Sequence, residues 1–248
     1  MGSYLIEEFI EHTNAASSRD EVFSLYMCAL RRLGFDRAIY TFVTDFPSIH
    51  QKAGHGVQCN FPDDWMEHYR IRGYQKIDPV IMQVLRSAAI FTWQHLTQTD
   101  YFDAGQLRIL DEGNEAGLHD GVGIPLYGTN GGVAGVGMAS SLGGIKPDKN
   151  MLSKIKLITE QFHLAYCAVE NLESDIPQPK LTQKEVEVLK WWAAGKSSDE
   201  IALIMCSSRT TIKFHVTNIY LKLSANTKIL AVTKAIRLGL VPLDTIGV

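Results

Sequence analysis

The chain of 248 residues lacks the features that mark secreted, membrane-spanning or disulfide-rich proteins. It has no apolar run of the roughly eighteen residues that a membrane helix requires. Its first residues also lack a basic segment followed by an apolar core, so we expect neither a membrane span nor a secretory signal. The four cysteines, at positions 28, 59, 167 and 206, show no C-x-x-C spacing. This predicts buried, reduced thiols in a cytoplasmic protein, without disulfides or a zinc site.

Motifs of common enzyme classes are also missing or incomplete. Gly195-Lys196-Ser197 matches the end of a phosphate-binding loop, but Lys190 stands where the first glycine of that loop is required. The glycines between positions 131 and 137 do not complete G-x-G-x-x-G, and the eight histidines show no metal-ligand spacing. No G-x-S-x-G nucleophile motif is present. We therefore predict that the protein is not an enzyme and has no catalytic residues, metal or cofactor.

The most informative pattern present, at residues 181–223, predicts three short helices separated by tight turns. Thr182 with Glu185, and Ser197 with Glu200, fit the S/T-x-x-E capping box. In this motif a hydroxyl and a carboxylate each accept a hydrogen bond from a free amide at the helix start. Two capping boxes in such close succession indicate two helix starts only one short helix apart.

The third helix of this segment has one apolar and one polar face. Ile212, Val216, Ile219 and Leu223 recur at helical spacing and should pack inward. Basic, hydroxyl and amide side chains lie on the opposite face. A short helix, a tight turn and such an amphipathic helix form a helix-turn-helix, whose second helix enters the DNA major groove. The alternative is a helical hairpin with solvated charges, but the capping boxes and the short turn favour DNA binding.

The charge distribution supports this interpretation. From Pro177 onward ten basic residues outnumber five acidic ones, whereas the preceding part has 14 basic and 22 acidic residues. A basic module attached to an acidic body predicts that the polyanion-binding surface lies at the C-terminus.

The part before this segment mixes helical and β-type periodicity. Two helices are expected within residues 3–33, with a break near 14–18. Helices on both sides of a mainly antiparallel sheet would give an α/β/α sandwich, an α+β fold of the kind seen in small-molecule sensors. The other predicted elements are β-type runs at 38–42, 57–60, 91–93, 121–126 and 133–140, the last two joined by an Asn130-Gly131 hairpin turn, and helices opening near 61 and 79 and spanning 107–116 and 151–172.

A short segment with two prolines and no periodicity, residues 173–180, is the predicted linker. It divides the chain into a ligand domain at 1–172 and a four-helix DNA-binding domain at 181–248. The long helix before it, 151–172, carries an apolar stripe that could cover the sheet or form a dimer interface. The sequence leaves both interpretations open.

Aromatic and apolar side chains are dense between Phe61 and Trp93. Trp65 and Tyr69 are one helical turn apart, and Asp78 lies in an otherwise apolar segment. Indole and phenol donors with one carboxylate acceptor could fix the polar head of a ligand inside an apolar cavity. Core aromatics with Asp78 as a plain helix cap are the alternative, which the residues by themselves favour.

Two sets of residues give the chain a resemblance to a known family. The C-terminal set is Leu181-Thr182, Glu185, Leu189, Trp191, Gly195-Lys196-Ser197, Glu200-Ile201-Ala202, Thr211-Ile212-Lys213-Phe214-His215 and Lys222-Leu223. It resembles the output domain of LuxR-type transcription regulators. We expect phosphate contacts from Lys196, Arg209 and Lys213. Base contacts are expected from Thr210, Thr217 and Asn218, and Thr211 and Phe214 complete the predicted DNA-binding set.

The N-terminal set, Trp65, Tyr69, Asp78-Pro79, Trp93 and Gly121, resembles the ligand domain of acyl-homoserine lactone receptors of this family. By that resemblance Trp65 donates its indole N–H to the lactone carbonyl, Asp78 accepts the ligand amide N–H, and Tyr69 hydrogen-bonds the acyl carbonyl. Gly121 allows close backbone approach. The resemblance also implies that Phe61, Val80, Trp93 and Leu110 line the pocket. Gly137 replaces a frequent Ser or Thr, and we expect it to make the pocket more permissive.

We therefore predict a cytoplasmic bacterial transcription factor with two binding functions. Its first domain would bind an N-acyl-homoserine lactone, and its second would bind a palindromic promoter element as a homodimer. The alternative is the same DNA-binding output controlled by a different apolar small molecule. A phosphorylation-controlled regulator would need an acidic pair directly after its first strand, whereas Asp63-Asp64 open a helix.

Overall fold

The computed structural model describes residues 2–46, 51–128, 132–169 and 179–241. The chain divides into two compact units, the first containing the described residues up to 169 and the second those from 179 onward. Each unit has a hydrophobic core of its own. Two domains are therefore present, while the predicted bounds of 1–172, 173–180 and 181–248 stay predictions. Most of the predicted linker, the Asn130-Gly131 turn and residues 242–248 lie outside the described residues.

The first unit is built on a five-stranded sheet with the order β2-β1-β5-β4-β3, in which every neighbouring pair is antiparallel. The central strands β1, β4 and β5 are rich in buried apolar side chains, which explains their position away from the sheet edges. The strands are β1 (Arg37–Phe42), β2 (Gly54–Cys59), β3 (Phe91–Thr92), β4 (His119–Tyr127) and β5 (Val133–Ser140). All five predicted strand positions are occupied.

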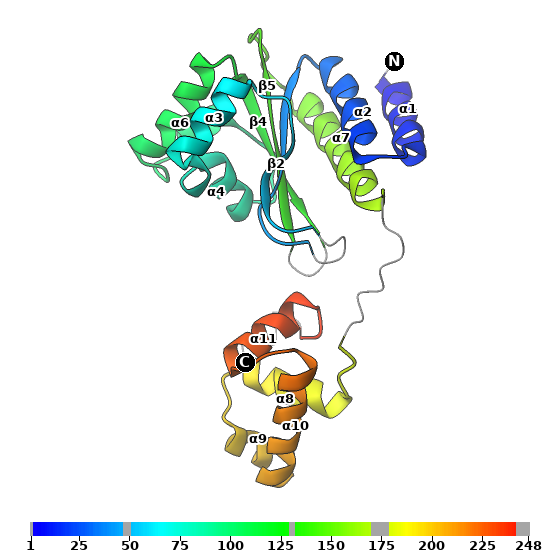
Figure 1. The fold of residues 1–248 in the computed structure, drawn as a ribbon, viewed down its shortest axis with the longest axis vertical. Coiled ribbons are helices and arrows are strands. Elements are labelled where there is room, and N and C mark those ends of the chain that lie inside the picture. Colours follow the sequence, from blue (N-terminus) through cyan, green and yellow to red (C-terminus); the bar gives the residue numbers. More distant parts are fainter. Residues whose placement is uncertain (1, 47–50, 129–131, 170–178, 242–248) are drawn as a thin grey trace. The chain divides into compact units, whose positions relative to one another are not determined.

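Helices cover both faces of this sheet, which confirms the α/β/α sandwich (Figure 1). One face carries α1 (Gly2–Ala15), α2 (Arg19–Arg31) and α7 (Lys149–Ala168). The other carries α3 (Asp63–Arg72), the short 3-10 helix η2 (Tyr74–Lys76), α4 (Pro79–Arg86), α5 (Trp93–Thr97) and α6 (Ala104–Glu115).

Several predicted boundaries differ from the observed ones, and two of these differences have a clear local cause. Trp93 opens α5 instead of extending the strand, because the Thr92 hydroxyl accepts the His95 N–H at 3.3 Å and caps a helix there. The long helix α7 ends at Ala168 and not at residue 172, because Val169 has left helical geometry (φ −62°, ψ 129°).

The apolar stripe of α7 packs on the sheet. Ile155, Ile158 and Phe162 are fully buried in the core of the first unit. Two buried polar contacts fix the helix in register. The first joins Tyr26 Oη of α2 to Thr159 Oγ1 at 2.8 Å. The second is a hydrogen bond of 2.6 Å between Tyr40 Oη and His163 Nδ1, and burial lowers the pKa of His163 to about 4, which keeps the imidazole neutral. The stripe therefore covers the sheet, the first of the two interpretations above.

The second unit consists of α8 (Gln183–Ala193), α9 (Ser198–Ile204), α10 (Arg209–Lys222) and α11 (Lys228–Arg237). Both predicted capping boxes are formed, and Ser208 caps α10. Gly195 has φ +85° directly after α8, as a glycine at a helix end should. Ile212 and Ile219 of α10 are fully buried, so its predicted inner face is confirmed at these positions.

The four cysteines are free thiols, but two are exposed. The expectation of burial is wrong for Cys28, which occupies an exposed position of α2, and for Cys206, which lies in the turn between α9 and α10 with φ +47°. Within the described parts of the chain, no helix is long and apolar enough to cross a membrane.

Candidate functional site

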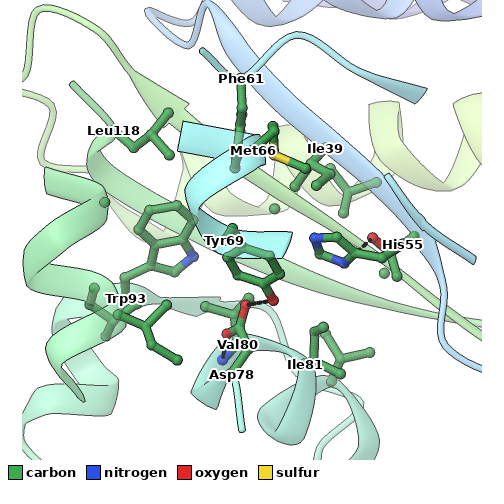
Figure 2. Close-up of a pocket in the computed structure, with 18 of the residues that line it drawn as sticks. Ile39, His55, Phe61, Met66, Tyr69, Asp78, Val80, Ile81, Trp93 and Leu118 are labelled. Carbon is green, nitrogen blue, oxygen red and sulfur yellow. Dashed lines mark hydrogen bonds between the residues drawn. The ribbon is translucent and has the colours of Figure 1, made fainter. Parts of the chain in front are cut away.

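A cavity in the first unit lies between the sheet and helices α3, α4 and α6 (Figure 2). The space open to the centre of a water molecule is about 60 Å³, several times the roughly 10–15 Å³ that one water needs. The structure brings all eight predicted ligand residues together on its wall, although they are up to 76 positions apart in sequence. These residues are Phe61, Trp65, Tyr69, Asp78, Val80, Trp93, Leu110 and Gly137.

Asp78 provides a buried acceptor in this cavity. Its Oδ1 accepts the Val80 N–H at 2.7 Å and caps α4, while its Oδ2 accepts the Tyr69 hydroxyl at 2.6 Å. Burial raises the pKa of Asp78, and the hydrogen bonds from Tyr69 and Val80 oppose that rise. Burial and the neighbouring carboxyl raise the pKa of Tyr69, which keeps its phenol protonated. The capping role and the cavity role of Asp78 therefore coexist.

Trp93 provides the complementary donor. Its indole Nε1 is buried and has no hydrogen-bond partner among the described residues. Figure 2 shows this nitrogen turned toward Tyr69. A buried donor without a partner costs about 1–3 kcal/mol, a cost that a ligand oxygen would remove. The ring lies directly on the backbone at Gly121, where a Cβ would be 1.8 Å from Trp93 Cδ2. This contact accounts for the glycine.

The other predicted residues form the apolar wall. Trp65 packs against Tyr69 with 6.0 Å between ring centroids. A Cβ added to Gly137 would meet Ile39 Cγ2 at 3.2 Å and Trp93 Cζ2 at 3.7 Å. The room beside Gly137 is thus bounded by two side chains, and the permissive role of this glycine stays a prediction.

A carboxylate behind the cavity holds the wall in place. Glu112 of α6 accepts hydrogen bonds from Tyr74 at 2.6 Å, from Arg108 at 2.7 Å and from His68 of α3 at 2.9 Å. These bonds, led by the Tyr74 hydroxyl, lower the pKa of Glu112 to about 2. They fix α3, which carries Trp65 and Tyr69, against α6.

Two polar residues that no sequence motif marks, His55 and Thr41, also line the cavity. His55 stacks on Tyr69 with 4.7 Å between centroids and 4° between planes. Thr41 Oγ1 lies 3.3 Å from His55 Nδ1. A histidine flanked by glycines on a strand of evenly half-buried residues gives no signal that this strand faces a cavity.

Seven of the predicted DNA-binding residues lie on α10 of the second unit and Lys196 lies in the turn before α9, and none of them is buried. Several have partners within the unit: Arg209 pairs with Asp199 at 2.7 Å, Lys196 lies 3.8 Å from Glu200, Thr211 Oγ1 bonds Ser208 Oγ at 2.8 Å, and Thr217 Oγ1 donates to the Lys213 carbonyl at 3.1 Å. Thr210, Lys213 and Phe214 are exposed, and Asn218 is half-buried. In the described parts of the unit, no ion pair involves Lys213.

Comparison with known proteins identifies both units. Residues 18–166 match the family model of the autoinducer binding domain, and residues 179–235 match that of the luxR family of bacterial regulatory proteins. The chain belongs to the LuxR family. As a LuxR-family protein it is a ligand-binding transcription regulator with a helix-turn-helix, and not an enzyme.

Relatives of this LuxR-family chain cover nearly all of it. The HTH-type quorum-sensing regulator RhlR of Pseudomonas aeruginosa is 31% identical over 231 aligned positions, and the match covers 89% of this chain and 89% of RhlR. The putative HTH-type transcriptional regulator y4qH of Sinorhizobium fredii is 29% identical and covers 97% of this chain and 74% of its own. The crystal structure of Escherichia coli SdiA shares the fold, with a TM-score of 0.67 at 21% identity over 95% of this chain and 97% of SdiA.

Proposed function

We propose that the first unit binds an N-acyl-homoserine lactone, and that the second unit binds a palindromic promoter element in the cytoplasm as a homodimer. One observation carries the ligand proposal: one largely apolar cavity is lined by a buried acceptor, Asp78, and by a buried donor, Trp93 Nε1, that has no partner among the residues the structure describes. An acyl amide offers an N–H for the carboxylate and a carbonyl oxygen for the indole. The acyl chain fills the apolar remainder.

The hydrogen bond that Tyr69 donates within the cavity bears on its predicted role as a donor to the acyl carbonyl. In the structure the Tyr69 hydroxyl donates to Asp78, so it orients the carboxylate that receives the ligand amide. For Tyr69 to donate to the acyl carbonyl instead, it would have to exchange this bond on binding. Trp93 requires no such exchange, because its N–H is free within the described surroundings.

The test is thermal unfolding of the full chain with lactones of increasing acyl length. We expect a chain-length-dependent rise of the midpoint, because a ligand at a hundred times its Kd adds about 2.7 kcal/mol to stability. Asp78→Asn keeps a residue that caps helices well, but it loses the charged acceptor, so the rise should largely disappear. Asp64→Asn, at an exposed position of α3, is the matched control and should respond like the wild type.

A second candidate is the same DNA-binding output controlled by another apolar small molecule. The fold relative SdiA has been solved in complex with octanoyl-rac-glycerol, with a TM-score of 0.66 and 21% identity over 94% of this chain and 93% of SdiA. Such an ester has hydroxyls but no amide N–H. The panel should therefore include it. A shift with this ester and none with any lactone, in folded protein that still binds DNA, would replace the lactone proposal.

The DNA-binding proposal is tested at Lys213, which is exposed on α10. Lys213→Ala should weaken binding to all duplex sequences and lower the slope of log K against log salt by about one, the contribution of one phosphate contact. Lys190→Ala, at an exposed position of α8, is the control and should leave the slope unchanged. An unchanged slope for Lys213→Ala would remove this residue from the phosphate contacts.

A further inference from the structure

His55 is a cavity residue that the contacts proposed above do not use. It lies on β2, and its ring is stacked almost parallel to the Tyr69 ring at 4.7 Å between centroids. In Figure 2 the His55 and Trp93 rings lie on opposite sides of Tyr69. The cavity therefore has a second polar position, separate from the Asp78 carboxylate and the Trp93 indole.

The imidazole is neutral and one of its nitrogens is already engaged. Burial lowers the pKa of His55 to about 4, so near neutral pH the ring has one N–H donor and one acceptor nitrogen. Nδ1 lies 3.3 Å from Thr41 Oγ1, and that hydroxyl oxygen also accepts the Gly56 N–H at 3.2 Å. Thr41 thus holds the ring by Nδ1, which leaves Nε2 as the nitrogen for a ligand.

Packing by itself does not explain a histidine here. A phenylalanine would stack on Tyr69 equally well and would not carry polar nitrogens out of water. The neighbouring cavity residues include the aliphatic Ile39 and Ile81, which Figure 2 shows on the same side as His55. They cannot satisfy a ring nitrogen. A ligand atom that forms a hydrogen bond would give this nitrogen a partner.

We propose that His55 selects acyl chains that carry an oxygen on the third carbon, either a 3-oxo or a 3-hydroxy group. This inference rests on the lactone function proposed above. Tyr69 connects the two positions: its hydroxyl bonds Asp78, the acceptor for the amide, while its ring face lies against His55. An oxygen on the carbon next but one to the amide carbonyl is the acyl substituent that we assign to this second polar position. A neutral imidazole can donate to a ketone or accept from a hydroxyl, with the Thr41 hydroxyl taking the complementary role.

The experiment compares binding to the full chain of three lactones with equal acyl length, one unsubstituted, one 3-oxo and one 3-hydroxy, by isothermal titration calorimetry. One added hydrogen bond should make an oxygenated lactone bind about tenfold more tightly to the wild type. His55→Phe keeps the stacked ring and should abolish this preference while changing the unsubstituted Kd by less than about twofold. His95→Phe, an exposed histidine of α5, is the control and should keep the preference.

A second variant protects against misfolding of His55→Phe. Thr41→Val removes the hydroxyl that orients the ring and should reduce the preference part of the way. If His55→Phe binds unsubstituted lactone normally and retains the wild-type preference, the inference is overturned. A wild type that binds all three lactones equally also overturns it, although the lactone function stands. If none of the lactones binds to folded wild type, the proposed function itself fails.

Discussion

At the scale of single residues, the cavity depends on a close contact between a large ring and a bare backbone. Trp93 lies on Gly121, and Asp78 is held by Tyr69 and by the N–H of Val80. The positions of these side chains leave one acceptor and one donor facing the same space. Gly121 provides the space for the Trp93 ring, and Tyr69 and Val80 fix the orientation of the Asp78 carboxylate.

Gly121→Ala should be strongly destabilising, because its Cβ would fall 1.8 Å from Trp93 Cδ2 and the ring would have to move. We expect a loss of about 1–3 kcal/mol or more in the free energy of unfolding. Gly137→Ala meets Ile39 at 3.2 Å and should cost less. Urea unfolding of both variants measures these losses in the free energy of unfolding. In Gly121→Ala combined with Trp93→Leu the clashing ring is absent, so part of the stability should return. Equal stability of Gly121→Ala and wild type, or no recovery in the double variant, would contradict the packing.

The sequence identified the cavity residues that belong to a spaced motif, and it missed those that do not. Trp65, Tyr69 and Asp78 stand out because polar groups interrupt an apolar segment. His55 has no such context, since the contact between β2 and α3 is made only in the folded sheet. The free nitrogen of Trp93 is also invisible in sequence, because its lack of a partner depends on everything around it.

At the scale of elements, several helix starts could be predicted because their capping residues are close together in sequence. Contacts between helices that are distant in sequence could not be predicted. The capping box of Thr182 and Glu185 was predictable because its two members are three residues apart. The same carboxylate also pairs with Lys222 at the end of α10, at 2.7 Å, and this contact was not predictable. At Thr92 a local signal was misread. The β-type run at 91–93 predicted a strand, whereas Thr92 is the N-cap of α5.

The pair of Glu185 and Lys222 ties the start of α8 to the end of α10. Burial would raise the pKa of Glu185, but bonds from Lys222 and Thr182 outweigh it and lower the pKa below 4.5. Stability from this pair is therefore complete above about pH 4.5 and disappears as the pH falls through the lower, folded-state pKa. Lys222→Met leaves the Glu185 charge buried without its partner, which should lower the free energy of unfolding by about 2 kcal/mol. This is less than the loss typical of a fully buried pair, because Lys222 is partly exposed.

Calorimetric unfolding of Lys222→Met, of Glu185→Gln and of the double variant, between pH 4 and 7, measures the coupling. The two single losses should not add in the double variant. Additive losses would show that the two side chains contribute independently.

At the scale of the whole molecule, two units with separate cores share one chain. Regulation requires that ligand burial in the first unit change the DNA-binding equilibrium of the second. We propose that ligand binding shifts the population toward a dimeric, DNA-competent form. The sequence indicated both binding functions, because each is encoded by local residue patterns. The coupling between them is a property of populations, which neither sequence patterns nor a single structure contains.

The central claim is tested most directly by the DNA affinity of the full chain with and without bound lactone. A palindromic duplex selected by the protein from a random pool serves as the probe, and its Kd is measured by fluorescence anisotropy at fixed salt. A lactone that raises the unfolding midpoint should tighten DNA binding about 5- to 150-fold, the usual range of coupling between two sites, and Asp78→Asn should abolish the effect. An identical Kd with and without such a lactone would contradict the account.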